Sequence, residues 1–106
     1  MRILFDQGTP APLRKALGAH SVETAFERGW SELENGALIS AAESEGFELL
    51  ITTDTNLRYQ QNLSGRSIAI LVLSTPSWPR IRKVSSEISV AVGEVSAGQF
   101  LEFEVR

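Results

Sequence analysis

The sequence contains no cysteine, a single histidine and fewer basic than acidic residues. The lack of cysteine excludes a disulfide framework, a thiolate zinc site and a cysteine nucleophile. A Ser-His-Asp triad would have to use His20, which lies far along the chain from the acids that end the apolar runs described below. The formal net charge of −3 argues against avid, nonspecific binding to nucleic acid, which relies on phosphate neutralisation by Lys and Arg.

Long apolar runs are also absent. None approaches the roughly 20 residues that a membrane span requires, and strand-like sequence begins at Arg2 instead of a signal-like segment. We therefore expect a soluble, cytoplasmic protein with no membrane partner. With 106 residues, of which 42% are apolar, the chain is expected to form one domain, 1–106. A chain of this size buries about 65% of its unfolded surface.

Strand-like and helix-like segments alternate about every 20 residues. Strands are expected at 2–5, 21–25, 47–53, 67–73 and 100–105, and helices at 10–17, between 31 and 46, at 55–62 and at 80–96. This alternation predicts βαβ units and hence an α/β fold with a parallel sheet. The 67–73 run hardly alternates, which is typical of a strand covered on both faces.

Local signals define several of these element ends. Thr9 is a candidate cap for the 10–17 helix, with Pro10 at its first position. Ser31 and Glu34 fit a capping box, and Gly46 is expected to end that helix. The alternating 100–105 segment predicts a half-exposed edge strand, and such an edge would allow a homodimer through strand pairing.

Two strands end in an aspartate. Asp6 follows the first strand and Asp54 follows the 47–53 strand, 48 positions later. In parallel α/β sheets ligands bind at the carboxyl ends of the strands, so we expect these two acids to share a site. Two carboxylates with amide oxygens and water suit Mg²⁺ or Mn²⁺. Asn35, on the inward side of its helix, and Asn56, two residues past Asp54, are candidate members of the same site.

Two other interpretations of these acids stay open. Asp6 could cap a turn and Asp54 could cap the 55–62 helix. A receiver-like phosphoacceptor domain also places acids after strands one and three. That interpretation needs an acidic pair and a later lysine, whereas Gln7 follows Asp6 and the segment 74–76 contains no lysine.

Three segments, 4–10 (Leu-Phe-Asp-Gln-Gly-Thr-Pro), 35–42 (Asn-Gly-Ala-Leu-Ile-Ser-Ala-Ala) and 51–57 (Ile-Thr-Thr-Asp-Thr-Asn-Leu), come in the order found in small PIN-like proteins. The chain resembles this family of predicted nucleases and toxin components over most of 1–75. The resemblance implies a three-layer α/β/α fold with a mainly parallel sheet of about five strands. It further implies Mg²⁺- or Mn²⁺-dependent cleavage of RNA by an endoribonuclease, and a toxin of this kind would pair with an antitoxin protein.

Carried over residue by residue, Asp6 and Asp54 match the family's metal-binding acids and Thr52 its threonine. The chain departs from the family at Gln7, at Asn35 and at Asn56, where amides stand in place of acids. An amide oxygen can coordinate a cation but brings no charge to hold it. The alternative is therefore a catalytically reduced PIN-like module that binds RNA or a protein partner.

Basic and aromatic residues after Asp54 are candidate RNA contacts. Arg58 and Tyr59 follow the second aspartate directly, and Arg80, Arg82 and Lys83 open the 80–96 segment. If these side chains line the acidic site, they would guide a phosphate backbone toward it. The alternative for each is an ordinary solvated helix face.

Overall fold

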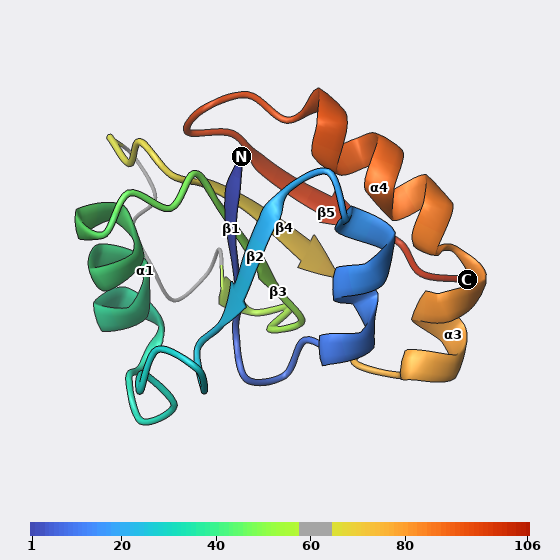
Figure 1. Ribbon diagram of the computed structural model, residues 1–106, viewed down its shortest axis with the longest axis horizontal. Helices are drawn as coiled ribbons and strands as arrows, with labels where there is room; N and C mark the ends of the chain where they lie inside the picture. Colours follow the sequence, from blue (N-terminus) through green and yellow to red (C-terminus); the bar gives the residue numbers. More distant parts are fainter. Residues whose placement is uncertain (58–64) are drawn as a thin grey trace.

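The computed structural model describes residues 1–57 and 65–106, and within them five parallel strands form one sheet in the order β2-β1-β3-β4-β5 (Figure 1). The strands are β1 (Arg2–Phe5), β2 (Ser21–Thr24), β3 (Leu49–Thr52), β4 (Ala69–Leu73) and β5 (Phe100–Phe103). The helices are η1 (Ala11–Leu17), α1 (Asn35–Ser44), α3 (Trp78–Lys83) and α4 (Ser85–Glu94). The predicted parallel α/β sheet is confirmed.

The inner strands are buried, except for Arg2 at the start of β1, because helices cover both faces of the sheet. Every residue of β3 and β4 is buried, whereas β2 and β5, at the two edges, are partly exposed. The nearly unbroken apolar runs of β3 and β4 are the sequence consequence of that two-sided burial. The predicted edge strand near the end of the chain is confirmed as β5, while a homodimer through that edge stays a prediction.

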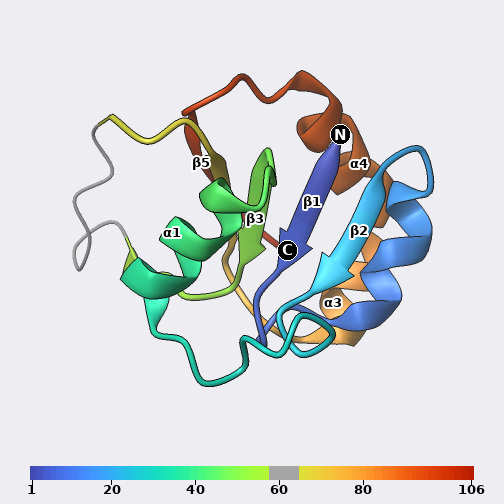
Figure 2. The ribbon, with the colours of Figure 1, turned by 60° about the vertical axis from the view of Figure 1, so that its left-hand side comes forward.

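Two apolar cores make the fold a three-layer structure (Figure 2). Alternate residues of a strand point to opposite faces, so Ile3 and Phe5 pack with η1, α3 and α4. Leu4, between them, packs in the other core with Leu38 and Ile39 of α1. The chain therefore crosses the face bearing η1 after β1, and the face bearing α1 after β2.

The start of α1 corrects the sequence analysis. The helix begins at Asn35, and neither Ser31 nor Glu34 forms a side-chain cap there, so the predicted capping box is wrong. The segment before it turns instead, with the Leu33 N–H donating to the Trp30 carbonyl over 3.0 Å. Because of that turn, the helix begins only after the chain has passed from the end of β2 to the face of the sheet that α1 covers. Gly46 does end α1, at a φ of +82° that favours glycine.

The prediction for 10–17 is also partly wrong. The segment forms a 3₁₀ helix, and Thr9 does not cap it. The Thr9 side chain lies instead within hydrogen-bond distance of the Asp6 carboxylate and the Ile51 carbonyl. Because these two acceptors lie at the ends of β1 and β3, the Thr9 hydroxyl bonds at the edge of the sheet and not to the backbone of the helix. Pro10 precedes the helix and does not take its first position.

The single helix predicted at 80–96 is two helices. They are α3 and α4, separated at Val84, whose φ of −116° and ψ of 17° are not helical. Ile81, Val84 and Ile88 are nevertheless buried in one core, because the change of direction keeps both helices against η1 and the sheet (Figure 1). Neither these helices nor any other in the described part of the chain is long and apolar enough to cross a membrane.

Candidate acidic site at the carboxyl edge of the sheet

The pairing of β1 with β3 brings Asp6 and Asp54 to the same edge of the sheet. The register sets Phe5 beside Ile51, so Asp6 and the residues after Thr52 leave the sheet together. The Asp6 N–H continues the ladder by donating to the Ile51 carbonyl over 3.1 Å. The two candidate acids thus extend from neighbouring strands.

Thr52 connects the two acids through one hydroxyl group. Its Oγ1 donates to Oδ2 of Asp6 and accepts from the backbone N–H of Asp54 over 3.1 Å. The Thr52 residue is only 1% exposed, so this contact is protected from water. A buried hydroxyl with both a donor and an acceptor role satisfied holds the Asp6 side chain and the Asp54 backbone in a fixed relation.

Thr9 holds the other oxygen of the Asp6 carboxylate. Oδ1 accepts from the Thr9 N–H at 3.1 Å and lies 2.7 Å from the Thr9 hydroxyl. The same hydroxyl is 2.9 Å from the Ile51 carbonyl, and it has one hydrogen to donate to either acceptor. Asp6 therefore stabilises the 6–9 turn, as the capping interpretation predicts for its local role.

Asp54 also accepts hydrogen bonds at both carboxylate oxygens. Oδ1 accepts from the Asn56 N–H at 3.0 Å, which closes an Asx turn after β3. Oδ2 accepts from Nδ2 of Asn35 at 2.6 Å. Asn35, the first residue of α1, therefore reaches the site as the helical spacing predicts, whereas Asn56 contacts Asp54 through its backbone.

The two carboxylates of the site accept hydrogen bonds from uncharged groups. All four carboxylate oxygens of Asp6 and Asp54 accept from hydroxyls, a side-chain amide or backbone N–H groups. In the ranges 1–57 and 65–106, neither acid forms an ion pair with lysine or arginine. The same ranges hold no group of three acids, histidines or cysteines that could bind a metal. The donor set thus fits a hard cation with oxygen ligands, but with two charged ligands only.

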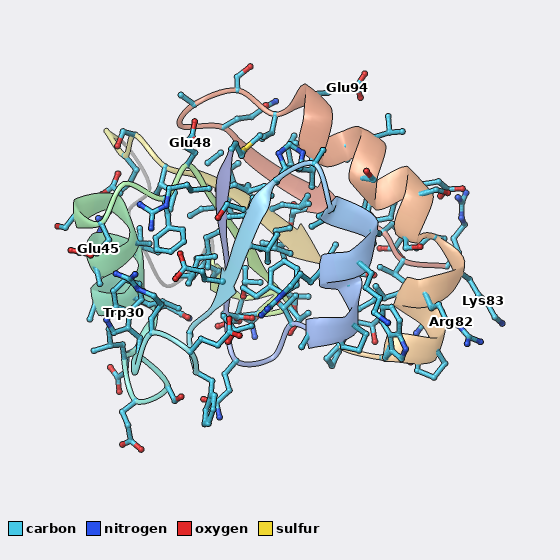
Figure 3. All side chains as sticks on the ribbon, viewed as in Figure 1. Trp30, Glu45, Glu48, Arg82, Lys83 and Glu94 are labelled. Carbon is cyan, nitrogen blue, oxygen red and sulfur yellow. The ribbon has the colours of Figure 1, made fainter. Side chains whose placement is uncertain are left out.

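The candidate RNA contacts lie in different places. Arg80 donates from Nη2 to the Val105 carbonyl over 2.9 Å. Arg82 and Lys83 extend outward from α3, away from the sheet (Figure 3). Arg58 and Tyr59 lie outside the described residues.

A pocket of about 500 Å³ adjoins Asp6 between the loops that follow β1 and β2. Its lining includes Arg14, Phe26 and Glu27, none of which the sequence analysis connected with the acids. Only the pairing of β1 with β2 brings these residues together. The short 6–9 turn leaves no room for a side chain at Gly8, where a Cβ atom would lie 2.6 Å from the Thr53 hydroxyl.

Comparison with protein-family models, with curated proteins and with solved structures finds no match to the chain.

Proposed function

We propose that the protein is a PIN-like ribonuclease that uses Mg²⁺ or Mn²⁺ bound between Asp6 and Asp54. The observation that supports this proposal is the Thr52 hydroxyl, which bonds to the Asp6 carboxylate and to the backbone N–H of Asp54. Neither of these two acids has a cationic partner in the described part of the chain. Adjacent like charges disfavour each other's ionised form. A divalent cation relieves that repulsion, and when bound it supplies Lewis acidity and a more acidic water for phosphodiester hydrolysis.

The surrounding side chains act as positioning residues for the two acids. The Thr9 backbone N–H and the Thr52 hydroxyl donate to Asp6, and the Asn35 side chain donates to Asp54. Such outer contacts fix ligand orientation, and their loss typically lowers metal affinity or activity by about 10- to 100-fold. A preoriented pair partly offsets the low number of charged ligands, because the protein does not have to order both side chains when the cation binds.

The activity test uses a labelled single-stranded RNA with Mn²⁺ and compares the wild type with Asp6→Asn and Asp54→Asn. Each asparagine preserves size and an acceptor oxygen while removing one charge. We expect each variant to lose cleavage by about 100-fold or more, because a charged ligand is worth at least as much as its supporting contacts. Glu94→Gln, at the exposed end of α4, is the matched control and should retain full activity. Equal cleavage by the wild type and both aspartate variants would overturn the proposal.

A second candidate is the catalytically reduced module that binds RNA or an antitoxin-type protein. Asn35 supports it, because this side chain donates an N–H to Asp54 where an acid would add a third charge. Under this proposal the wild type neither binds Mn²⁺ nor cleaves RNA. The double substitution Gln7→Glu with Asn35→Asp would then create Mn²⁺ affinity in an otherwise inactive protein.

A further inference from the structure

The pocket beside Asp6 lies where two neighbouring connections leave the sheet in opposite directions. After β1 the chain passes to the face that bears η1, and after β2 it passes to the face that bears α1 (Figure 2). In parallel α/β sheets ligands bind outside the carboxyl ends of the strands. The pocket of about 500 Å³ lies there, lined from the β1 side by Asp6 and Gln7 and from the β2 side by Thr24 and Phe26.

Phe26 gives this pocket an exposed aromatic wall. It is 76% exposed, the highest value among the exposed large apolar residues of the described chain. An aromatic side chain that folding leaves in water contributes little to the core. Beside a pocket it offers a flat apolar surface, and such rings bind the bases of single-stranded RNA by stacking.

The charges of the pocket favour a base over a phosphate group. Nη2 of Arg14 lies 2.8 Å from Oε1 of Glu27, so this end of the arginine that lines the pocket is already paired. That hydrogen bond is the main cause that lowers the pKa of Glu27 below its ordinary value. The lining thus contains two acidic side chains, Asp6 and Glu27, and one basic side chain, Arg14. A neutral base therefore fits better than a phosphate, which would meet two carboxylates.

We infer that this pocket binds one nucleobase of a single-stranded RNA, stacked on Phe26, and so sets the strand beside the acidic site. The pocket is continuous with that site because Asp6 belongs to both: its carboxylate oxygens bond to Thr9 and Thr52, and its residue lines the pocket. The inference rests on the proposed ribonuclease function for the identity of the ligand. It adds a binding residue, Phe26, from a loop that contributes no acid to the site.

The test measures binding with the divalent cation removed, so that it does not depend on cleavage. A fluorescein-labelled oligoadenylate of six nucleotides is titrated with protein in EDTA and followed by fluorescence anisotropy. Phe26→Ala should weaken binding by a factor of roughly 5 to 150, the range that one base–aromatic stack provides. Phe26→Trp keeps an aromatic face and should stay within about threefold of the wild type.

Val90→Ala is the matched control, because Val90 is a 62% exposed apolar residue on α4. It should bind as the wild type does, and thermal unfolding should show all three variants to be folded.

If Phe26→Ala binds the oligonucleotide as well as the wild type, or if neither binds, the inference is overturned. Weaker binding by Phe26→Ala without any Mn²⁺-dependent cleavage by the wild type would support the base pocket while contradicting the ribonuclease proposal. Normal binding by Phe26→Ala with normal Mn²⁺-dependent cleavage by the wild type would overturn the base pocket while supporting the ribonuclease proposal.

Discussion

The acids at the two ends of α1 differ in their partners: those near its end pair with arginine, whereas the acid at its start accepts from a neutral amide. At the end of the helix Glu43 lies 2.9 Å from Arg66, and Glu45 lies 2.6 Å from Arg28. At its start Asn35 donates an amide N–H to Asp54, which has no ion pair within the described residues. The helix dipole favours an anion at the start of a helix and opposes one at its end. Glu43 and Glu45 thus require arginine, whereas Asp54 is tolerated without it.

Aromatic rings reinforce the arginines near the end of α1. The guanidinium of Arg2 lies 4.3 Å from the ring centre of Phe47, and that of Arg28 lies 4.7 Å from the ring of Trp30. The two rings meet edge to face, with their centres 6.1 Å apart. Contacts of this kind stabilise the fold by up to about 1 kcal/mol each where they are exposed. Figure 3 shows Trp30 and Glu45 on the side of the molecule that carries α1.

This difference separates residues that stabilise the fold from residues available to a ligand. The acids near the end of α1 are neutralised by the chain itself, so their contribution does not depend on any bound cation. Asp6 and Asp54 have no such ion pair among the described residues, so the stability of the folded protein should depend on whether a cation binds between them. Substitutions at the two ends should therefore affect different measurements.

The largest effect on stability is expected for Glu43→Ala. The Glu43 carboxylate accepts from Arg66, from the Ser67 N–H at 2.7 Å and from the Ile68 N–H at 3.2 Å. Removing it leaves partly buried donors without an acceptor, and each hydrogen bond to a charged group contributes about 1.5–3 kcal/mol. We expect a loss of about 2–3 kcal/mol in urea-induced unfolding.

Glu94→Ala is the control for that experiment, since Glu94 projects from the outer surface near the end of α4 (Figure 3). Its free energy of unfolding should stay within about 0.5 kcal/mol of the wild type. Mn²⁺ binding should be the same in both variants. An equal loss of stability in the two variants would show that the end of α1 is not specially stabilised.

The next effect concerns pH. Burial by itself raises the pKa of Glu43, but hydrogen bonds from Arg66, Ile68 and Ser67 outweigh it and lower the pKa from 4.5 to about 2. The unfolded chain therefore binds the proton more readily than the folded chain, so stability falls as the pH decreases. The contribution, about 1–2 kcal/mol, should be complete above pH 5 and lost on acidification to about pH 2.

Urea unfolding of the wild type and of Glu43→Gln between pH 2 and pH 6 measures this contribution. The difference in stability between the two proteins should be largest at pH 6 and shrink toward pH 2. A difference that stays constant over the whole range would contradict the assignment.

A smaller effect is expected at the start of α1 for Asn35→Asp. The substitution replaces the amide donor to Asp54 with a third carboxylate, so like charges meet where a hydrogen bond was. Without a divalent cation the variant should unfold about 1 kcal/mol more easily than the wild type. Saturating Mn²⁺ should reverse the order, because a third charged ligand strengthens cation binding to the folded state. A variant that is less stable than the wild type with and without Mn²⁺ would contradict a cation site.

Much of the sheet could be predicted from sequence because burial on both faces leaves long apolar runs, as in β3 and β4. The same runs located Asp6 and Asp54, and helical spacing directed Asn35 toward the sheet. The start of α1 could not be located, because a local match to a capping box carries no information about the turn that precedes Asn35. Phe26 was missed for a different reason: its pocket exists only because β2 pairs with β1, a long-range contact that local patterns do not encode.

Asp6 and Asp54 are proposed to form one cation site, and calorimetric titration with Mn²⁺ tests this proposal most directly. The wild type should bind one Mn²⁺ weakly, Asp6→Asn and Asp54→Asn should each lose that binding, and Asn35→Asp should bind more tightly. Heats that are identical for the wild type and both aspartate variants, with no increase in Mn²⁺ affinity in Asn35→Asp, would contradict a shared cation site at Asp6 and Asp54.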